Sequence, residues 1–556
     1  MARRSAHSPV PCTLLVLALA CNGGDTDEST GASGTASTAG STSTGTTATS
    51  SGASSGQGGS TAATATSGTA TSTSATDTTG GTTTTGPKFD LGGGPDAPPP
   101  PACTTGKIPA TCAEAEACPT SVGCRFYAVD LDQLDGGDDH PYAVAVSNVQ
   151  SSSDVVVSVE QKMGGAWQVV AGPVTIPALD LHVFELPDLH QEGSGMKAGG
   201  AYRVTADAPV AAYQMNPLNI QAGIASSDAT MLYPVTTWDD IYHVVGWEPY
   251  PHTAYVTVAA AVDGTTVQFE TAAPVTAGPG VPASMPGDVF TVDLDEGDVV
   301  EIMTQTNGVT FTGTRISSDP DHPIAVFSGA ECTFVLAYSC DHVETQLSGL
   351  RLWGKQFVAA RVPPRTTPPE TSVFQIYASE DGTTVTFDAP PEVTGLPAAP
   401  AALDAGEVLT LEVGGTAAVP GDFVVTADKP IAIANYMTGS SLAGSIGDPA
   451  MVQLPPVEQF LPRYVVLVPP SWNDDRLVLV RPADTGVTVD GTPVDPAAFV
   501  TAGAGFEVAR IQVTDGVHVV EGDAPVGVVV VGVTSVDSYA YLGGVGAEVI
   551  NPTPEG

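Results

Sequence analysis

A short motif that recurs along the chain is the feature that most restricts its fold. Asp-x-Pro followed by small apolar residues begins at Asp207, Asp321, Asp428 and Asp523, and successive prolines lie 114, 107 and 95 residues apart. A second signature, a Leu with aromatic residues six and ten positions later, keeps nearly the same period. It occurs as Leu232/Trp238/Tyr242, Leu347/Trp353/Phe357 and Leu454/Phe460/Tyr464. Repetition at a nearly constant period indicates tandem copies of one folding unit.

Each repeat has the composition of β-structure. From Arg125 onward, runs rich in Val, Ile, Thr and Tyr alternate with Gly, Asp and Pro, with about seven such runs per repeat. We therefore predict an all-β protein of about four tandem β-sandwich-like repeats, each of roughly 110 residues. The repeats are expected at about residues 125–226, 227–330, 331–445 and 446–550, within a region that spans 102–556. A propeller-like closed array, with two short blades per repeat, is the alternative.

The repeated residues have structural roles that their chemistry suggests. Asp-x-Pro predicts a turn that leads into a strand, because proline fixes φ. The segments "DGTTVQF" at Asp263 and "DGTTVTF" at Asp381 predict hairpin turns, since Asp-Gly accepts positive φ. The paired aromatic residues are expected to fill a core.

The N-terminus predicts export and a lipid anchor. Residues 1–20 combine Arg3 and Arg4 with a short apolar run, and the run ends in Leu-Ala-Leu-Ala before Cys21. This resembles a bacterial lipobox with Ala18 in the usual Leu position, so Cys21 is the predicted lipidation site; an ordinary secretory signal is the alternative. Residues 21–101 are rich in Ser, Thr, Gly and Pro and predict a disordered tether with a reach of roughly 50 Å.

Charge and cysteine content narrow the environment and the partners. The net charge of −43 excludes nucleic acid as a partner, because phosphate binding needs clustered Lys and Arg. Six cysteines remain in the exported chain, an even number that predicts disulfides. They are Cys103, Cys112, Cys118, Cys124, Cys332 and Cys340. The first four allow three pairings, and the last two are expected to pair with each other.

The stretch Cys340-Asp341-His342 has the residue types of a nucleophilic enzyme. A catalytic reading needs a free thiolate, which export disfavours, and adjacent residues on a strand face opposite ways. A Cys332–Cys340 bond would close nine residues and stabilise the fold by roughly 2.5 kcal/mol. We therefore favour the disulfide, with His342 and Glu344 supporting a loop between the second and third repeats.

One acidic run is a candidate calcium site. Asp130, Asp132 and Asp135 are spaced loosely like the ligands of a calcium loop, but Leu134 and Pro141 stand where ligands belong. A solvated acidic turn is the alternative. No other cofactor is expected, because the sequence has no phosphate loop, HExxH or GxSxG motif.

Three segments resemble the IgGFc-binding protein N-terminal domain family, which is abundant in bacterial surface lipoproteins. They are "VGCRFYAVDLDQLD" at Val122, "SGAECTFVLAYSCDHVETQLSGLRLWGKQF" at Ser328 and "GDPAMVQLPPVEQFLPRYVVLVP" at Gly447. The motif residues carried over are Asp341, His342, Gln346, Trp353 and Phe357, while "QLSG" replaces the frequent "QLPP". The resemblance implies a binding role and no known catalytic reaction. The family name alone does not establish binding to antibody Fc.

These observations together predict a non-catalytic adhesion lipoprotein on a bacterial outer membrane or cell surface. Its expected partner is a glycan or another extracellular macromolecule, and its contact with the membrane is expected only through the lipid. An extracellular polysaccharide hydrolase and a structural envelope component are the alternatives.

Overall fold

The computed structural model describes residues 106–552 and 554, except 135, 139, 219–225 and 471. The predicted signal peptide, lipidated Cys21, tether, Cys103 and Asp135 lie outside the described residues. The chain divides into Met1–Thr85 and Gly86–Gly556, and every described residue belongs to the second unit.

The described chain is built almost entirely of strands, which confirms the predicted all-β class. Four successive modules contain them, and the elements follow here in chain order. Module 1 comprises α1 (Cys112–Ala117), β1 (Gly123–Ala128), β2 (Tyr142–Asn148), β3 (Val155–Met163), β4 (Ala166–Ile176), β5 (Leu181–Leu186), β6 (Gly195–Lys197), β7 (Tyr202–Asn216) and β8 (Asp228–Leu232). Module 2 comprises η1 (Val235–Thr237), β9 (Ile241–His243), β10 (Ala254–Ala260), β11 (Thr265–Glu270), β12 (Val289–Leu294), β13 (Val299–Met303), β14 (Arg315–Ser317), β15 (Ile324–Val335) and β16 (Ala337–Gln346).

The second half of the chain repeats this order. Module 3 comprises η2 (Leu350–Leu352), β17 (Gly354–Ala359), β18 (Ser372–Ala378), β19 (Thr383–Asp388), β20 (Ala401–Leu403), β21 (Val408–Val413), β22 (Phe423–Tyr436), η3 (Ser440–Leu442) and β23 (Met451–Leu454). Module 4 comprises η4 (Val457–Gln459), β24 (Leu461–Val468), β25 (Asp474–Pro482), β26 (Val487–Val489), β27 (Thr492–Pro493), η5 (Pro496–Ala498), β28 (Val500–Gly503), β29 (Phe506–Val513), β30 (Gly516–Val533) and β31 (Ser538–Leu542).

Each module is an antiparallel β-sandwich, as predicted. Module 2 shows its two layers most clearly, as sheets of order β16-β15-β10-β13-β6 and β12-β11-β14-β9. In the other modules one long strand, β7, β22 or β30, takes part in both layers and joins them into one curled sheet. The strand β15 runs through residues 330 and 331, where the sequence placed a boundary between repeats.

The Asp-x-Pro motif marks the bend of the long strand, which corrects its predicted role as a turn before a strand. Along β7, pairing with β1 shifts from Thr205–Arg125 to Val210–Gly123, so residues 206–209 bulge out of the ladder. Equivalent shifts occur on β22 and β30. Proline has no N–H for the ladder and is tolerated at such a bulge. Only in module 2 does the motif separate two strands, β14 and β15.

The Asp-Gly turns connect the two layers, so the hairpins predicted at these positions are wrong. The turn at Gly264 joins β10 to β11, and these strands belong to different sheets. The positive φ of Gly264, 71°, explains the glycine. Its N–H donates to Asp295 at 3.0 Å, and Gly382 of module 3 donates to Asp404 at 2.9 Å. The predicted turns therefore form at these positions, but packing determines which strands pair.

The second signature links consecutive modules. After its Leu, the chain makes one 3₁₀ turn, and both aromatic residues are buried in every copy, as predicted. The Tyr242 hydroxyl donates to the carbonyl of Ile324 at 2.8 Å, and Tyr464 donates to Val526 at 2.5 Å. Ile324 and Val526 directly follow the prolines of their modules. The two repeated signatures thus contact each other inside a module.

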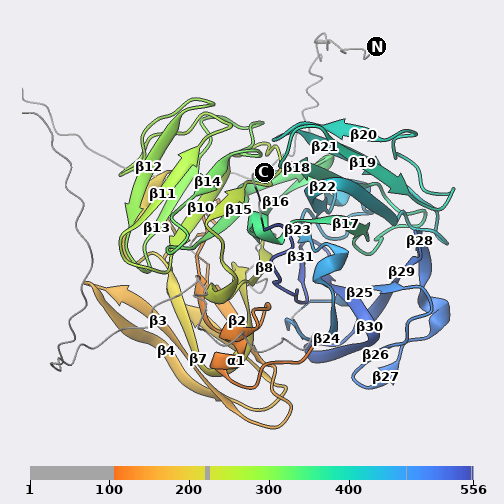
Figure 1. The fold of residues 1–556 in the computed structure, drawn as a ribbon, viewed down its shortest axis with the longest axis horizontal. Helices are drawn as coiled ribbons and strands as arrows, with labels where there is room; N and C mark the ends of the chain where they lie inside the picture. The colour runs from red at the N-terminus through yellow and green to blue at the C-terminus, as the bar shows by residue number, and fades with distance from the viewer. Residues whose placement is uncertain are drawn as a thin grey trace, which may run out of the picture. The chain divides into compact units, whose positions relative to one another are not determined.

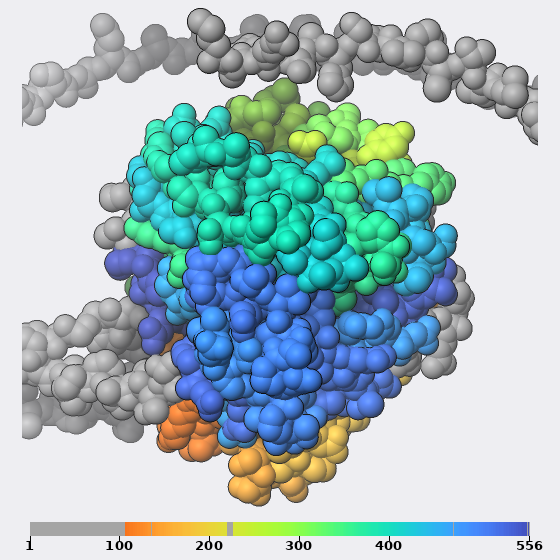
Figure 2. Space-filling model, turned by 90° about the vertical axis from the view of Figure 1, so that its right-hand side faces the viewer, coloured from red at the N-terminus to blue at the C-terminus, as the bar shows by residue number. Residues whose placement is uncertain are grey.

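The four modules close on themselves around the strands β8, β16, β23 and β31 (Figure 1). The N–H of Glu344 in β16 and the N–H of Met451 in β23 both donate to Asp228 at the start of β8. Ser227 of module 1 donates to Asp537 of module 4, 310 residues later. Modules 3 and 4 pack side by side in Figure 2, and the Arg510–Asp422 ion pair joins them at 2.6 Å. We call the meeting point of the four strands the module junction.

Candidate functional site

A disulfide-closed hairpin projects beside the module junction. Cys332 in β15 and Cys340 in β16 are bonded, and Leu336 forms the turn between the strands. The expected loop between repeats is thus a β-hairpin that belongs to module 2. Its segment "TFVLAYS" at residues 333–339 has no charged residue, in a chain whose net charge is −43.

Exposed apolar side chains gather on this hairpin and on neighbouring loops. We call this set the apical face. It consists of Tyr250, Phe334, Leu336, Tyr338, Leu442, Ile446 and Val536. Tyr338 is 77% exposed and Tyr250 is 57% exposed, while Phe334 is half-buried between their rings. Apolar side chains that are exposed together indicate an interaction surface.

Direct contacts connect the loops of the apical face. The N–H of Phe334 donates to the carbonyl of Tyr250 at 2.8 Å, and the N–H of Gly439 donates to Val335 at 3.0 Å. The N–H of Gly447 then donates to Thr534 at 3.0 Å, which brings in the loop of module 4. Modules 2, 3 and 4 therefore all contribute to one continuous surface.

Backbone strain occurs on the same loops. Leu336, Ser339 and Ser445 have φ of 56°, 140° and 65°, a region that favours glycine. Leu336 is also 43% exposed, so its side chain is not required for the core. Non-glycine residues held in such conformations are concentrated at functional sites.

The family-motif residues lie beneath this surface and not on it. Asp341, His342, Gln346, Trp353 and Phe357 are all buried. Burial lowers the pKa of His342 to about 3, so its imidazole is neutral. Gln346 accepts a hydrogen bond from the N–H of Tyr233 at 2.8 Å and thereby ties module 2 to module 1. With Cys340 in a disulfide, the Cys-Asp-His stretch has no free thiol and no basic histidine for catalysis.

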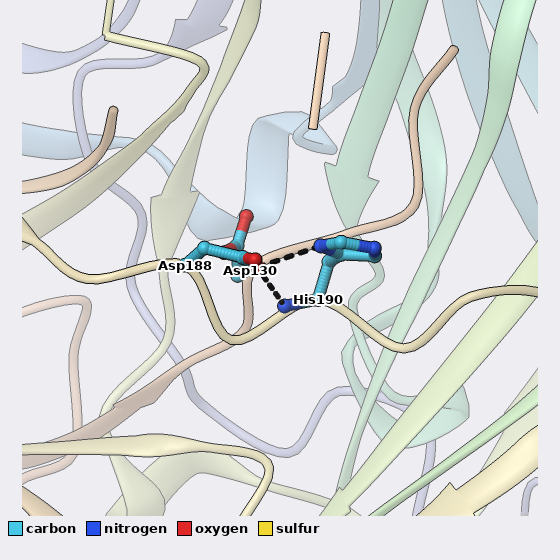
Figure 3. A group of neighbouring side chains, drawn as sticks. All are labelled: Asp130, Asp188 and His190. Atoms are coloured by element: carbon cyan, nitrogen blue, oxygen red, sulfur yellow. Dashed lines mark hydrogen bonds and ion pairs between the residues drawn. The ribbon is translucent and has the colours of Figure 1, made fainter. Parts of the chain in front are cut away.

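Two of the predicted calcium residues, Asp130 and Asp132, brace a loop of module 1, and Figure 3 shows Asp130 with its neighbours Asp188 and His190. Asp130 accepts the N–H of Leu189, and Asp132 accepts the N–H of Gly193, both at 2.8 Å. Burial raises the pKa of each carboxyl to about 7. Calcium at Asp130 and Asp132 stays a prediction.

A histidine offers this group an internal cation. The Nδ1 atom of His190 lies 2.6 Å from Asp188, and oxygens of Asp130 and Asp188 lie within 4.8 Å of a His190 nitrogen. Burial by itself would lower the pKa of His190, but the hydrogen bond to Asp188 and the nearby carboxylates raise it above its usual value. A protonated His190 can therefore neutralise its acidic neighbours.

A second disulfide holds the N-terminal segment. Cys112 is bonded to Cys124. This bond is one of the pairings that the sequence left open. Cys118 is also disulfide-bonded. None of the helices among the described residues is long and apolar enough to cross a membrane.

A family model and a human protein match this chain in sequence. Residues 228–532, more than half of the chain, match the family model described as IgGFc binding protein. A human protein named IgGFc-binding protein is 27% identical over 271 residues, which is 48% of this chain and 5% of that protein. The chain thus corresponds to a small part of this relative. No solved structure matches the chain.

Proposed function

Since the chain belongs to the IgGFc-binding protein family, we propose that it is a non-catalytic, extracytoplasmic protein that binds a macromolecule through the apical face. The observation that carries the proposal is the group of exposed Tyr, Leu, Ile and Val side chains on three adjoining modules. This group stands out on a protein with 61 acidic and 18 basic residues.

The composition of the apical face favours a protein partner. Two exposed tyrosines offer rigid, amphipathic contact area, which is typical of binding hot spots. The aliphatic side chains of Leu336, Leu442 and Ile446 suit the apolar surface of a protein better than the hydroxyls of a polysaccharide. A polysaccharide or mucin ligand is the competing outcome of the test below.

The N-terminal residues support display at a surface. A lipid on Cys21 followed by the tether 21–101 would hold the modules away from the membrane. The disulfides Cys112–Cys124 and Cys332–Cys340 support an oxidising, extracytoplasmic location. On the same grounds we propose a bacterial outer membrane as the place of display and adhesion as the role.

The acidic residues at the module junction give no support to a hydrolase. Asp341, Asp448 and Asp537 are buried, whereas catalytic carboxylates must meet the substrate in an accessible cleft.

A binding panel tests the proposal. The purified chain is measured against immobilised IgG Fc, mucin, purified polysaccharides and extracellular matrix proteins. Fc is included because the relative's name states that it binds this fragment. We expect retention by at least one protein ligand.

Substitutions then locate the binding surface. Tyr338→Ala should weaken binding by at least about tenfold, in the range of an interface hot spot. Met285→Ala removes a side chain of module 2 that is 58% exposed and outside the apical face, and should leave binding unchanged. Equal losses in both variants would contradict the placement of the site, and retention by polysaccharides alone would reject a protein partner.

A further inference from the structure

Carboxylates from three modules converge at the module junction. Asp341 lies in β16, Asp448 precedes β23 and Asp537 directly precedes β31. One oxygen of each carboxylate lies within 4.8 Å of the others. All three residues are at most 2% exposed. Three acidic groups therefore share one small volume that solvent does not reach.

Two of these carboxylates have oxygens that no hydrogen bond satisfies. Apart from the contact between the Asp341 and Asp448 carboxyl groups themselves, neither Oδ1 nor Oδ2 of Asp341 has a donor, and Oδ1 of Asp448 has none. Asp537 differs, because it accepts hydrogen bonds from Ser227 and from the N–H of Ser538, both at 3.0 Å. A buried carboxylate without donors is strongly destabilising, so such groups are normally paired or bound to a metal.

Cations compensate this group only in part, through the charge of Arg365 near Asp448. In the part of the chain that the structure describes, these carboxylates form no ion pair with Lys, Arg or His. Arg365 approaches only the backbone oxygen of Asp448, at 3.5 Å. Its guanidinium is instead paired with the buried Glu370 at 3.3 Å.

Some other buried acids among the described residues are compensated, although Asp132 and Glu301 each keep one oxygen without a partner. Asp228, next to the same junction, accepts three backbone N–H groups, from Ala229, Glu344 and Met451. Asp130 and Asp188 have His190 beside them. Asp341 and Asp448 thus lack the donors that Asp228 has, and their group contains no histidine such as His190.

We propose that Asp341, Asp448 and Asp537 bind one divalent cation of the hard, oxygen-preferring class, with calcium as the expected ion. All the ligand atoms offered are carboxylate oxygens, and no Cys or His is part of the group. This donor set suits calcium or magnesium and disfavours zinc. Calcium accepts irregular arrangements of carboxylates, whereas magnesium demands near-octahedral geometry.

The ion would join the modules to one another. Its ligands come from modules 2, 3 and 4, and Ser227 of module 1 is hydrogen-bonded to Asp537. Asp341 also directly follows Cys340, so the ion would fix the base of the disulfide-closed hairpin. The inference does not depend on the identity of the macromolecular ligand, because its probes are metal ions alone.

Without an ion, the same carboxylates would have to be protonated. Burial first, and the charges of neighbouring acids second, raise the pKa of Asp341 and of Asp448 well above its usual value. Protonated carboxyls would not respond to calcium at neutral pH, so the two states can be separated by experiment.

The test begins with the metal content of the purified chain. Metal analysis after dialysis against micromolar calcium should find at least one calcium ion per chain. The chain is then stripped with EDTA, dialysed and titrated with Ca²⁺ or Mg²⁺ by calorimetry and thermal unfolding. We expect calcium to raise the Tm, and magnesium to do so only at higher concentration.

Matched Asp→Asn variants assign the ion to this group. Asp341→Asn should lower calcium affinity by at least about tenfold, since even outer ligand partners have effects of this size. Asp188→Asn removes one charge from the half-exposed group of module 1 and should keep the affinity. If Asp341→Asn does not fold, Asp448→Asn replaces it. Absence of bound calcium and of any Tm shift in the wild type, or loss of the shift in Asp188→Asn alone, would overturn the proposal.

Discussion

Removal of the Cys332–Cys340 disulfide should loosen the apical face while the modules stay folded. The bond closes nine residues, and the chain-entropy model gives such a closure about 2.5 kcal/mol. The strand β15 remains paired with β10 below the hairpin, so we expect the loss to appear as local opening. At 1.4 kcal/mol per factor of ten, the opening equilibrium of the hairpin should rise about 60-fold.

Amide hydrogen exchange measures this opening directly. The N–H of Phe334 donates to Tyr250, and the N–H of Gly439 donates to Val335, so both report on the closed hairpin. In Cys332→Ala/Cys340→Ala both amides should exchange about 60-fold faster. Binding through the apical face should weaken in proportion to the fraction of molecules in which the hairpin is open.

The second disulfide provides a matched control. Cys112→Ala/Cys124→Ala removes a bond that closes 13 residues, for a comparable loss of about 3 kcal/mol. This change should leave exchange at Phe334 and Gly439 at the wild-type rate. The reasoning is refuted if these amides exchange as slowly in the hairpin variant as in the wild type, because packing alone would then hold the apical face.

Three further predictions follow from buried polar groups. In the presence of a chelator, the stabilisation from Asp130 and Asp132 should be fully present below about pH 4 and lost as the pH rises to about 7. The reason is that the pKa of each carboxyl in the folded protein, about 7, exceeds its usual value of 3.8. Urea unfolding across this pH range should show a smaller decline in the free energy of unfolding for Asp130→Asn than for the wild type. Asp422→Asn breaks the buried pair with Arg510 and should destabilise the contact of modules 3 and 4 by about 3–5 kcal/mol, measured by denaturant unfolding. Tyr464→Phe removes the hydroxyl between two repeated signatures and should cost about 1–3 kcal/mol in the same assay.

The periodic signatures predicted the fold because each copy forms one complete sandwich. In every copy the Leu lies at the end of a strand or directly after it, one 3₁₀ turn follows, and the second aromatic residue lies in the next strand. A period does not determine where a copy begins, however. The strand β15 therefore continues through residues 330 and 331, and β6 of module 1 pairs with β13 of module 2.

Local turn chemistry predicted where the chain bends but not which strands pair. Asp-Gly at residue 263 does make a turn with positive φ at Gly264, yet the flanking strands lie in separate layers. Asp207-Ala-Pro209 interrupts a ladder, yet β7 continues on both sides of it. Pairing depends on contacts between residues far apart in sequence, which short motifs do not contain.

The grouping of Asp341, Asp448 and Asp537 was missed because these residues are about 90–110 residues apart in sequence. A signal for them does exist in the repeats. Asp341 and Asp448 stand six residues before the Leu of the second signature, and Asp537 stands five residues before Leu542. An acid that recurs at one phase of a repeat is brought to one point when the repeats close around a centre.

The position of these acids explains how an acidic junction can be compatible with a closed arrangement of modules. Three buried carboxylates in one small volume repel one another when they are charged, and this repulsion alone would favour separation of modules 2, 3 and 4. One divalent ion reverses the sign of that interaction, because each carboxylate then attracts the same centre. Tyr338, Ile446 and Val536 of the apical face stand three, two and one residues before Asp341, Asp448 and Asp537. Closure of the modules and the geometry of the apical face would therefore depend on the same ion.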